Sequence, residues 1–327
     1  MAAAQRPVLA LDIGGTKLAV AVVTPDGRSH HFTVEPTRRD EGPDIILRRL
    51  FDLGRQVIER AKVEDGLWPI AAVGISCGGP LDARTGVLTN PLHLPGWVNV
   101  PIVDLATAEF GVPVVLENDA TAAVMGEYRY GAAKGADVAL YLTVSTGIGG
   151  GAVLGGRLHR GAAGNGGEFG HIMVRPGGRL CMCGRLGCLE GYASGTSIAQ
   201  RATEALAQSD TPSSLRELDI VRAEDVSAAA KGGDPLARAI WDETTEVLSV
   251  AVTDLVNVFE PNVVVLGGGV TRSGSALLDP VREAVLRDAM PPAAKAASIV
   301  LAGLGDEVCV IGAAALAFDR VAEVAHV

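Results

Sequence analysis

The sequence has few cysteines, few aromatic residues and no long hydrophobic run. Five cysteines occur among 327 residues, and Phe, Trp and Tyr together make up 4% of the chain. No apolar signal stretch opens the chain, and its apolar runs are interrupted by Gly, Pro or charged residues well before they reach bilayer length. We therefore expect a cytoplasmic protein with no membrane partner, in which a reducing environment disfavours disulfides.

Positive charge is also scarce. The chain has 28 Lys and Arg against 38 Asp and Glu, which gives a formal net charge of -10. This balance argues against a general nucleic-acid binder, so we expect no nucleic-acid partner. What the chain does have is hydrophobic residues, at 48% of the total. That fraction is enough to build one or two ordinary cores in a chain of this length, and we expect two domains.

Three of the five cysteines lie close in sequence to one histidine. His171 is followed by Cys181, Cys183 and Cys188, with glycines that permit a tight loop before the last of them. Thiolates and a neutral imidazole are the preferred ligands of tetrahedral zinc. The alternative, that these cysteines are small buried hydrophobes, suits a lone cysteine better than three at this spacing. The sequence predicts a structural zinc whose four ligands all come from the protein. Cys77 and Cys309 lie outside this set and are expected to pack as buried thiols.

The first glycine-rich loop joins two predicted strands. Residues 8–12 form a predicted buried strand, and a returning strand covers residues 18–23. Between them lies the tight loop Gly14-Gly15-Thr16-Lys17, in which glycines let backbone N–H groups approach an anion and Thr16 adds a hydroxyl donor. Asp12, at the strand end before the loop, is placed to hold hydrated magnesium.

A second glycine-rich loop has the same organisation. A predicted strand over residues 138–144 is followed by the glycine loop Ser145–Gly151, which contains Thr146 and Gly147, and by a return over residues 152–154. Neither loop has the P-loop spacing. Taken singly, each fits an ordinary hairpin turn as well as it fits a phosphate-binding loop. The repeated organisation predicts a duplicated architecture.

A third glycine run, Gly267-Gly268-Gly269, follows a predicted strand over residues 262–266. Consecutive glycines at a strand end leave room for a flat ligand such as an adenosine moiety, although a strand-to-helix turn without a ligand fits equally well. The rest of the chain alternates strands and helices, including a mostly helical stretch from about residue 196 to 259, so the fold class is α/β.

Asp119 lies where a predicted strand meets a predicted helix that begins at Ala120. Strand ends of this kind gather ligands in open α/β sheets. Asn and Asp are also the preferred helix N-cap residues, and the local sequence by itself favours capping by Asn118 or Asp119 over a catalytic role.

Six motifs of this sequence, in order and over nearly its whole length, resemble those of the ROK family of sugar kinases, repressors and related proteins. The EFGH and CMCGRLGCLE motifs are the most specific of them. The motifs are LDIGGTK (11–17), GISCGGP (74–80), ENDATA (117–122), STGIGGG (145–151), EFGH (168–171) and CMCGRLGCLE (181–190).

The resemblance implies a duplicated actin-like ATPase fold of the ribonuclease H-like type, with sugar and ATP in the cleft between two α/β domains. We expect an N-terminal domain over residues 1–119 and a larger C-terminal domain over residues 120–310 that carries the zinc loop. A C-terminal helix near residues 311–327 is expected to pack back on the first domain.

The resemblance also implies roles for individual residues. Asp119 would be the general base that accepts the proton of the attacking sugar hydroxyl, and His171 would bind zinc with one ring nitrogen and face the sugar with the other. The expected sugar-binding residues are Gly79, Asn118, Asp119, Glu168, His171 and Glu190. The residues expected to bind ATP and Mg²⁺ are Asp12, Gly14, Gly15, Thr16, Lys17, Thr146, Gly147, Gly267, Gly268 and Gly269.

Among such kinases the resemblance favours transfer of the γ-phosphoryl group of ATP to the 6-hydroxyl of glucose. The alternatives are mannose, fructose, N-acetylmannosamine, another amino-hexose or a cyclitol, and polyphosphate is a further phosphoryl donor in relatives. His93 replaces the Asn that is usual in the family's Pro-Asn-Leu-Pro-Gly-Trp loop, so it either retunes sugar recognition or is neutral. A homodimer or homotetramer is expected from the resemblance.

Two other classes are expected to fit less well. Repressors of the family carry an N-terminal winged helix, and here the first predicted strand begins by Val8. A non-catalytic sugar sensor would not need both phosphate loops together with Asp119.

Overall fold

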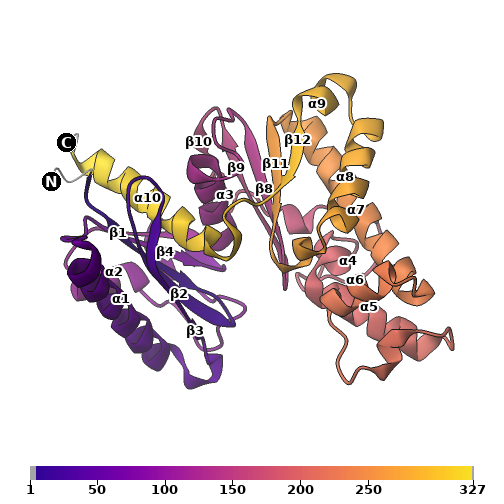
Figure 1. Ribbon diagram of the computed structural model, residues 1–327, viewed down its shortest axis with the longest axis horizontal. Coiled ribbons are helices and arrows are strands. Elements are labelled where there is room, and N and C mark those ends of the chain that lie inside the picture. The colour runs from indigo at the N-terminus through magenta and orange to yellow at the C-terminus, as the bar shows by residue number, and fades with distance from the viewer. Residues whose placement is uncertain (1–4, 326–327) are drawn as a thin grey trace. The chain divides into compact units, whose positions relative to one another are not determined.

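The computed structural model describes residues 5–325, which form two compact units (Figure 1). Unit 1 comprises the described residues up to Gly135, the segment Arg160–Gly166, and the described residues from Gly303 onward. Unit 2 comprises Ala136–His159 and Gly167–Ala302. Each unit contains its own sheet and its own hydrophobic core.

Unit 1 is built on a mixed sheet in the order β3-β2-β1-β4-β7. β1 pairs antiparallel with β2 and parallel with β4, which pairs parallel with β7. The strands are β1 (Val8–Ile13), β2 (Lys17–Val23), β3 (Ser29–Pro36), β4 (Val73–Cys77) and β7 (Val114–Asn118). A small hairpin of β5 (Leu81–Asp82) and β6 (Val87–Leu88) lies outside this sheet.

Helices cover both faces of this sheet because its central strands are apolar on both sides. Alternate residues of β1 belong to different cores: Leu9 and Leu11 pack with α1 and α2, whereas Val8 and Ala10 pack with α10. The helices of unit 1 are α1 (Pro43–Asp65), α2 (Ile102–Phe110), α3 (Asp119–Tyr130) and α10 (Val308–Ala325), with the short 3-10 turns η2 (Arg39–Glu41) and η6 (Gly305–Glu307).

Unit 2 repeats the pattern of unit 1 with a sheet in the order β10-β9-β8-β11-β12. β8 pairs antiparallel with β9 and parallel with β11, as β1 does with β2 and β4. The predicted duplication is therefore confirmed in the strand order. The strands are β8 (Ala139–Val144), β9 (Ile148–Leu154), β10 (Arg157–Leu158), β11 (Val263–Gly267) and β12 (Ser298–Leu301).

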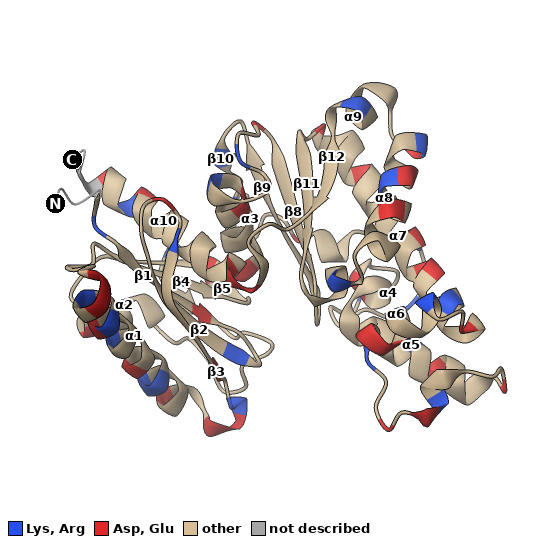
Figure 2. Ribbon diagram, viewed as in Figure 1, with Lys and Arg blue, Asp and Glu red and all other residues tan. Residues whose placement is uncertain are grey.

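The helices of unit 2 pack into a second core that includes residues of β8 and β11. They are α4 (Glu190–Ala193), α5 (Gly195–Gln208), α6 (Ala223–Lys231), α7 (Pro235–Phe259), α8 (Ser275–Asp288) and α9 (Pro291–Ala296), with η3 (Phe169–His171), η4 (Ser214–Glu217) and η5 (Gly269–Ser273). Figure 2 shows that acidic and basic residues are interspersed along α1 and α8. Within residues 5–325, no helix has the length and apolar character needed to cross a membrane.

Three features differ from the sequence-based expectations. Most of the predicted glycine loop Ser145–Gly151 is strand, because β9 begins at Ile148 and its glycines pair with β8. The first unit extends to Gly135 rather than ending at residue 119. Cys309, which was expected to be a buried thiol like Cys77, is partly exposed at the start of α10.

Close packing of two helices explains why α3 belongs to unit 1. A Cβ atom at Gly312 of α10 would lie 1.9 Å from the carbonyl oxygen of Ala122 in α3, and one at Gly126 would lie 3.0 Å from the carbonyl oxygen of Val308. Glycine at these positions lets the two backbones approach more closely than larger residues would allow.

Candidate functional site

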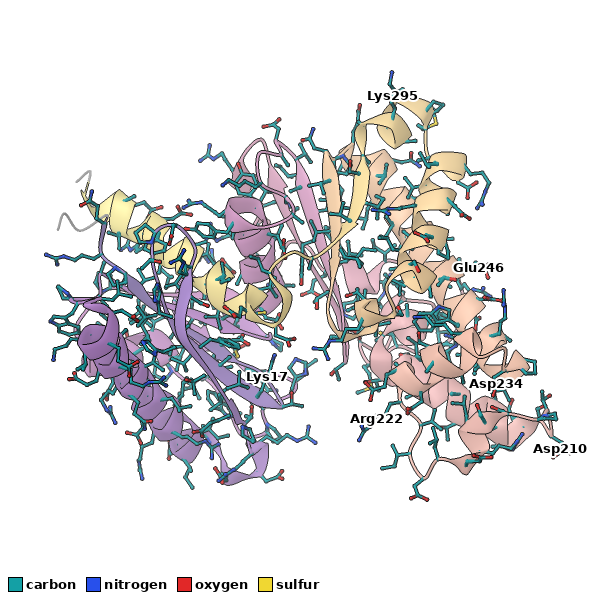
Figure 3. All side chains as sticks on the ribbon, in the orientation of Figure 1. Lys17, Asp210, Arg222, Asp234, Glu246 and Lys295 are labelled. Carbon is teal, nitrogen blue, oxygen red and sulfur yellow. The ribbon has the colours of Figure 1, made fainter. Side chains whose placement is uncertain are left out.

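The turn between β1 and β2 contains the first predicted phosphate loop. Gly14 N–H donates to the Lys17 carbonyl at 3.0 Å, and Thr37 Oγ1 donates to the Gly14 carbonyl at 2.6 Å. A Cβ atom at Gly15 would lie 2.6 Å from the Cβ of His93, so this turn has no room for a side chain there. Figure 3 shows Lys17 at the tip of this hairpin.

Asp12 precedes this turn in β1 and is buried, with 8% of its surface exposed. Ser76 Oγ in β4 donates to Asp12 Oδ1 at 2.8 Å. Burial raises the pKa of Asp12 to about 7; the Ser76 hydrogen bond and Lys17 oppose that effect, whereas the charge of Asp119 adds to it. A nearby cation would stabilise the ionised form of a carboxylate buried in this way, which fits the predicted magnesium role of Asp12.

Asn118 and Asp119 follow β7 and begin α3. Asn118 is the N-cap, because its side-chain oxygen accepts from the backbone N–H groups of Ala120 and Thr121. Asp119 Oδ1 accepts from the Ala120 N–H at 2.8 Å. Burial raises the pKa of Asp119, while the Ala120 N–H and the His93 imidazole oppose the shift. A raised pKa suits a carboxylate that must accept a proton.

His93 lies beside these groups in the loop before α2. A Cβ atom at Gly78 would lie 2.8 Å from His93 Nε2 and 3.7 Å from Asp119 Oδ2, so the imidazole and the carboxylate flank the same glycine. A Cβ atom at Gly79 would lie 3.7 Å from Asn118 Nδ2. Unit 1 therefore brings the Asp12 turn, Gly79, His93 and the Asn118-Asp119 pair to one end of its sheet, where β1, β4 and β7 run parallel.

Two residues that support this end of unit 1 were missed from the sequence. Glu117 in β7 is 2% exposed, and its two oxygens accept from Asn118 N–H at 3.1 Å and from Arg160 Nε at 2.8 Å. An ion pair at a buried carboxylate removes the cost of leaving the charge unpaired. A glutamate inside an apolar strand was a signal that could have identified Glu117. Nothing in the local sequence pointed to its partner Arg160, which lies 43 residues later.

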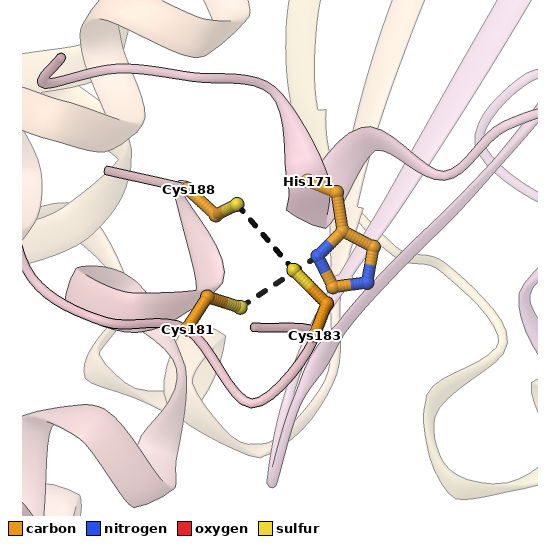
Figure 4. A group of neighbouring side chains, drawn as sticks. All are labelled: His171, Cys181, Cys183 and Cys188. Atoms are coloured by element: carbon orange, nitrogen blue, oxygen red, sulfur yellow. Dashed lines mark hydrogen bonds between the residues drawn. The ribbon is translucent and has the colours of Figure 1, made fainter. Parts of the chain in front are cut away.

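Unit 2 holds the predicted metal ligands in one cluster (Figure 4). One ligand atom from each of His171, Cys181, Cys183 and Cys188 lies within 4.8 Å of every other. His171 Nδ1 is 3.7 Å from Cys181 Sγ, and Cys183 Sγ is 3.7 Å from Cys188 Sγ. The Cys183–Cys188 sulfur separation is too long for a disulfide bond of about 2.05 Å. It is close to the edge of about 3.8 Å that two zinc–sulfur bonds of about 2.3 Å give in a tetrahedron, so the residues fit the ion.

The predicted sugar-binding residues of unit 2 surround this cluster. His171 turns Nδ1 toward Cys181, and its Nε2 is 3.9 Å from Glu168 Oε2. Glu190, the first residue of α4, has Oε1 3.7 Å from Cys181 Sγ. One ring nitrogen of His171 thus faces the thiols while the other faces a carboxylate, as a ligand with two roles requires.

The other two glycine runs meet within unit 2. Thr146 and Gly147 form the turn between β8 and β9, closed by a hydrogen bond of 2.9 Å from Ser145 N–H to the Gly147 carbonyl. β11 pairs with β8, which places Gly267 opposite Thr143. A Cβ atom at Gly268 would lie 2.5 Å from the Val144 carbonyl oxygen, so the third glycine run lies beside this turn, and Gly269 begins η5.

Known proteins are similar to this chain over nearly its full length. The glucokinase of Thermotoga maritima is 34% identical over 318 residues, covering 96% of this chain and 98% of its own. The solved ROK hexokinase of Thermus thermophilus is 38% identical with a TM-score of 0.81, covering 97% and 99%. A ROK family glucokinase from Streptomyces griseus, solved with glucose and AMPPNP, is 33% identical with a TM-score of 0.79, covering 96% and 99%.

The family model for the ROK family matches residues 8–320, from the first residue of β1 into α10. That range contains the proposed base, both hairpin turns, the third glycine run and the four clustered metal ligands. With this match and relatives above 30% identity over almost their whole length, the chain belongs to the ROK family.

Proposed function

We propose that this chain is an ATP-dependent glucokinase that transfers the γ-phosphoryl group of ATP to the 6-hydroxyl of glucose. The observation that carries the proposal is Asp119, a partly exposed carboxylate with a raised pKa at the end of a parallel strand, beside the buried carboxylate Asp12. Sequence identity of 34% to two glucokinases, over 96% and 92% of the chain, supports glucose as the substrate.

Asp119 is the proposed general base. Phosphoryl transfer needs an oriented hydroxyl, neutralisation of phosphate charge and an acceptor for the hydroxyl proton. The Ala120 N–H fixes one carboxylate oxygen of Asp119, and the raised pKa makes the group a better proton acceptor than an ordinary exposed aspartate. The proton of the attacking hydroxyl passes to this carboxylate.

The nucleotide is proposed to contact the glycine turns. Backbone N–H groups of Gly14, Gly15 and Gly147, the Thr16 and Thr146 hydroxyls, and the Lys17 ammonium suit phosphate oxygens, and Gly267, Gly268 and Gly269 suit the adenosine moiety. Asp12 would hold hydrated Mg²⁺, which offsets phosphate charge when bound.

The sugar is proposed to be recognised by several hydrogen-bonding side chains. Asn118, Glu168, His171 and Glu190 can each share hydrogen bonds with vicinal hydroxyls, and Gly79 leaves room beside Asn118. Zinc bound to His171, Cys181, Cys183 and Cys188 would fix the ring orientation of His171 and the loop that leads to Glu190. The ion is structural in this proposal, because four protein ligands fill a tetrahedral site.

An amino-sugar kinase is the second candidate, and His93 is the observation that favours it. Its imidazole lies beside Asp119, at the position where the family pattern has Asn. A ring there presents different donors and acceptors to a sugar than an amide does.

A kinase assay across a panel of sugars tests the proposal. Purified protein with ATP and Mg²⁺ is offered glucose, mannose, fructose, N-acetylmannosamine and glucosamine, and ADP release is followed. The proposal predicts the highest kcat/KM with glucose. It would be contradicted if none of these sugars supported ATP turnover.

Two further measurements test the other expectations. Polyphosphate in place of ATP tests the phosphoryl donor, and sedimentation velocity tests the expected homodimer or homotetramer.

A further inference from the structure

The turn between β8 and β9 is held by the chain segment that follows the metal cluster. Gly195 N–H donates to the Ser145 carbonyl at 2.7 Å, and Thr196 N–H approaches the Thr146 carbonyl at 3.4 Å. Both donors belong to the start of α5, which comes directly after α4. The turn proposed to bind phosphate therefore depends on contacts from the region that begins with Glu190.

Glu190 supplies the side-chain contact to this turn. Its Oε2 accepts from the Ile148 N–H at 2.8 Å, directly after Gly147. A Cβ atom at Gly147 would lie 2.7 Å from the same oxygen, which is closer than van der Waals contact allows. The missing side chain of Gly147 thus creates the space that the carboxylate occupies.

The second oxygen of Glu190 faces the metal cluster. Oε1 lies 3.7 Å from Cys181 Sγ, and the backbone carbonyl of Glu190 accepts from Ser197 Oγ at 2.7 Å. The loop of the metal ligands therefore contacts the Glu190 carboxylate, and α5 anchors the Glu190 backbone. All of these contacts lie within unit 2.

We propose that Glu190 is a positioning residue for the nucleotide, in addition to its proposed contact with sugar. Its carboxylate fixes the Ser145–Gly147 turn in the conformation that binds the phosphates of a nucleoside triphosphate, so the loop of the metal ligands influences nucleotide affinity when no sugar is present. The inference rests on the proposed function, in which this turn contacts ATP.

Calorimetric titration with AMPPNP and Mg²⁺, without sugar, tests this role. Glu190→Ala removes the acceptor for the Ile148 N–H, and we expect the dissociation constant for AMPPNP to rise about three- to ten-fold, as for one lost hydrogen bond. Glu190→Gln keeps an amide oxygen that can accept from Ile148, so its AMPPNP affinity should stay within about two-fold of the unmodified protein.

Glu217→Gln is the charge-matched control. Glu217 is exposed in η4 and belongs neither to the metal cluster nor to the glycine turns, so its change should leave AMPPNP affinity unaltered. If Glu190 were only structural, Glu190→Ala would lower thermal stability, but Glu190→Ala and Glu190→Gln would bind AMPPNP with the same affinity.

Gly147→Ala keeps the inference testable if Glu190→Ala folds poorly. It places a methyl group against Glu190 Oε2 and should displace the carboxylate, with a similar loss of AMPPNP affinity. Where Glu190→Ala does fold, adding Gly147→Ala to it should cost little further affinity, because the clashing oxygen is gone.

Equal AMPPNP affinity of Glu190→Ala and the unmodified protein would overturn the inference while leaving the proposed kinase intact. If the unmodified protein phosphorylates no sugar and does not bind AMPPNP, the proposed function and this inference both fail. Loss of affinity in Glu190→Ala and Gly147→Ala, with Glu190→Gln near normal, supports it.

Discussion

Asn118 and Asp119 are adjacent, yet their side chains have different partners. Asn118 caps α3 through two backbone N–H groups, whereas Asp119 contacts one of them and lies beside Gly78 and His93. Because the Asn118 side chain caps the helix, the Asp119 carboxylate can be replaced by an amide without removing the cap.

Replacing Asp119 by Asn tests the base directly. The variant keeps the size of the side chain and removes the proton acceptor, so we expect kcat to fall about 10²- to 10⁴-fold. Asp104→Asn, at an exposed position in the first turn of α2, is the control and should keep normal kcat. A folded Asp119→Asn protein with near-normal kcat would rule out the assignment.

The raised pKa of Asp12 predicts a pH dependence of stability in magnesium-free buffer. Its folded-state value of about 7 exceeds the ordinary value of 3.8, so the native state holds the proton more tightly than the unfolded chain does. The contribution of Asp12 to stability should therefore fall as pH rises from about 4 to about 7.

Asp12→Asn removes this titration, and we expect the variant to exceed the unmodified protein in stability at pH 8 by an amount on the order of 1–4 kcal/mol, with little difference at pH 4. Denaturant unfolding at the two pH values measures it. An equal difference at both pH values would show that Asp12 does not titrate in this range.

His93 is expected to influence the choice of sugar. His93→Asn should change the ratio of kcat/KM between glucose and glucosamine, because the imidazole lies next to Asp119 and offers different hydrogen bonds from an amide. Steady-state kinetics with both sugars measure the ratio, and an unchanged ratio would remove His93 from sugar recognition.

At the scale of elements, the loop of metal ligands connects the predicted zinc site to the proposed sugar contacts. His171 begins this region at the end of η3, and Glu190 ends it at the start of α4. A change in the metal site is therefore expected to be measurable as a change in sugar binding.

Cys183→Ser tests that connection. We expect loss of zinc in metal analysis and an increase in the KM for glucose of about ten-fold or more, as when a group that orients a ligand is lost. Met182→Ser changes the neighbouring side chain, which is 92% exposed, and should affect neither quantity. Zinc lost with unchanged sugar kinetics would contradict the connection.

The sequence predicted most of these elements but not how the glycines of the second hairpin are used. The three clustered cysteines and His171 were found because short spacing brings ligands together locally. The glycines at 149–151 were assigned to a loop, yet they lie in β9 and pair with β8. Close packing requires glycine at position 150, where a Cβ atom would lie 2.3 Å from the Phe169 ring. Contacts that depend on tertiary packing leave no local pattern.

At the scale of the whole molecule, the two units repeat one strand order around separate cores. The repeated strand and glycine-turn pattern made the duplication predictable. The extent of unit 1 was not predictable in the same way, because the place of α3 depends on its packing with α10, and the pairing of Arg160 with Glu117 joins residues far apart in the chain.

The product formed from glucose, ATP and Mg²⁺ tests the proposed glucokinase activity directly. Phosphorus–proton correlation in an NMR spectrum of the reaction mixture locates the new phosphate ester. A glucokinase whose base is Asp119 predicts glucose phosphorylated at its 6-hydroxyl by the unmodified protein and almost none by Asp119→Asn in the same time. A phosphate on another hydroxyl, no sugar phosphate at all, or equal yields from both proteins would contradict the account.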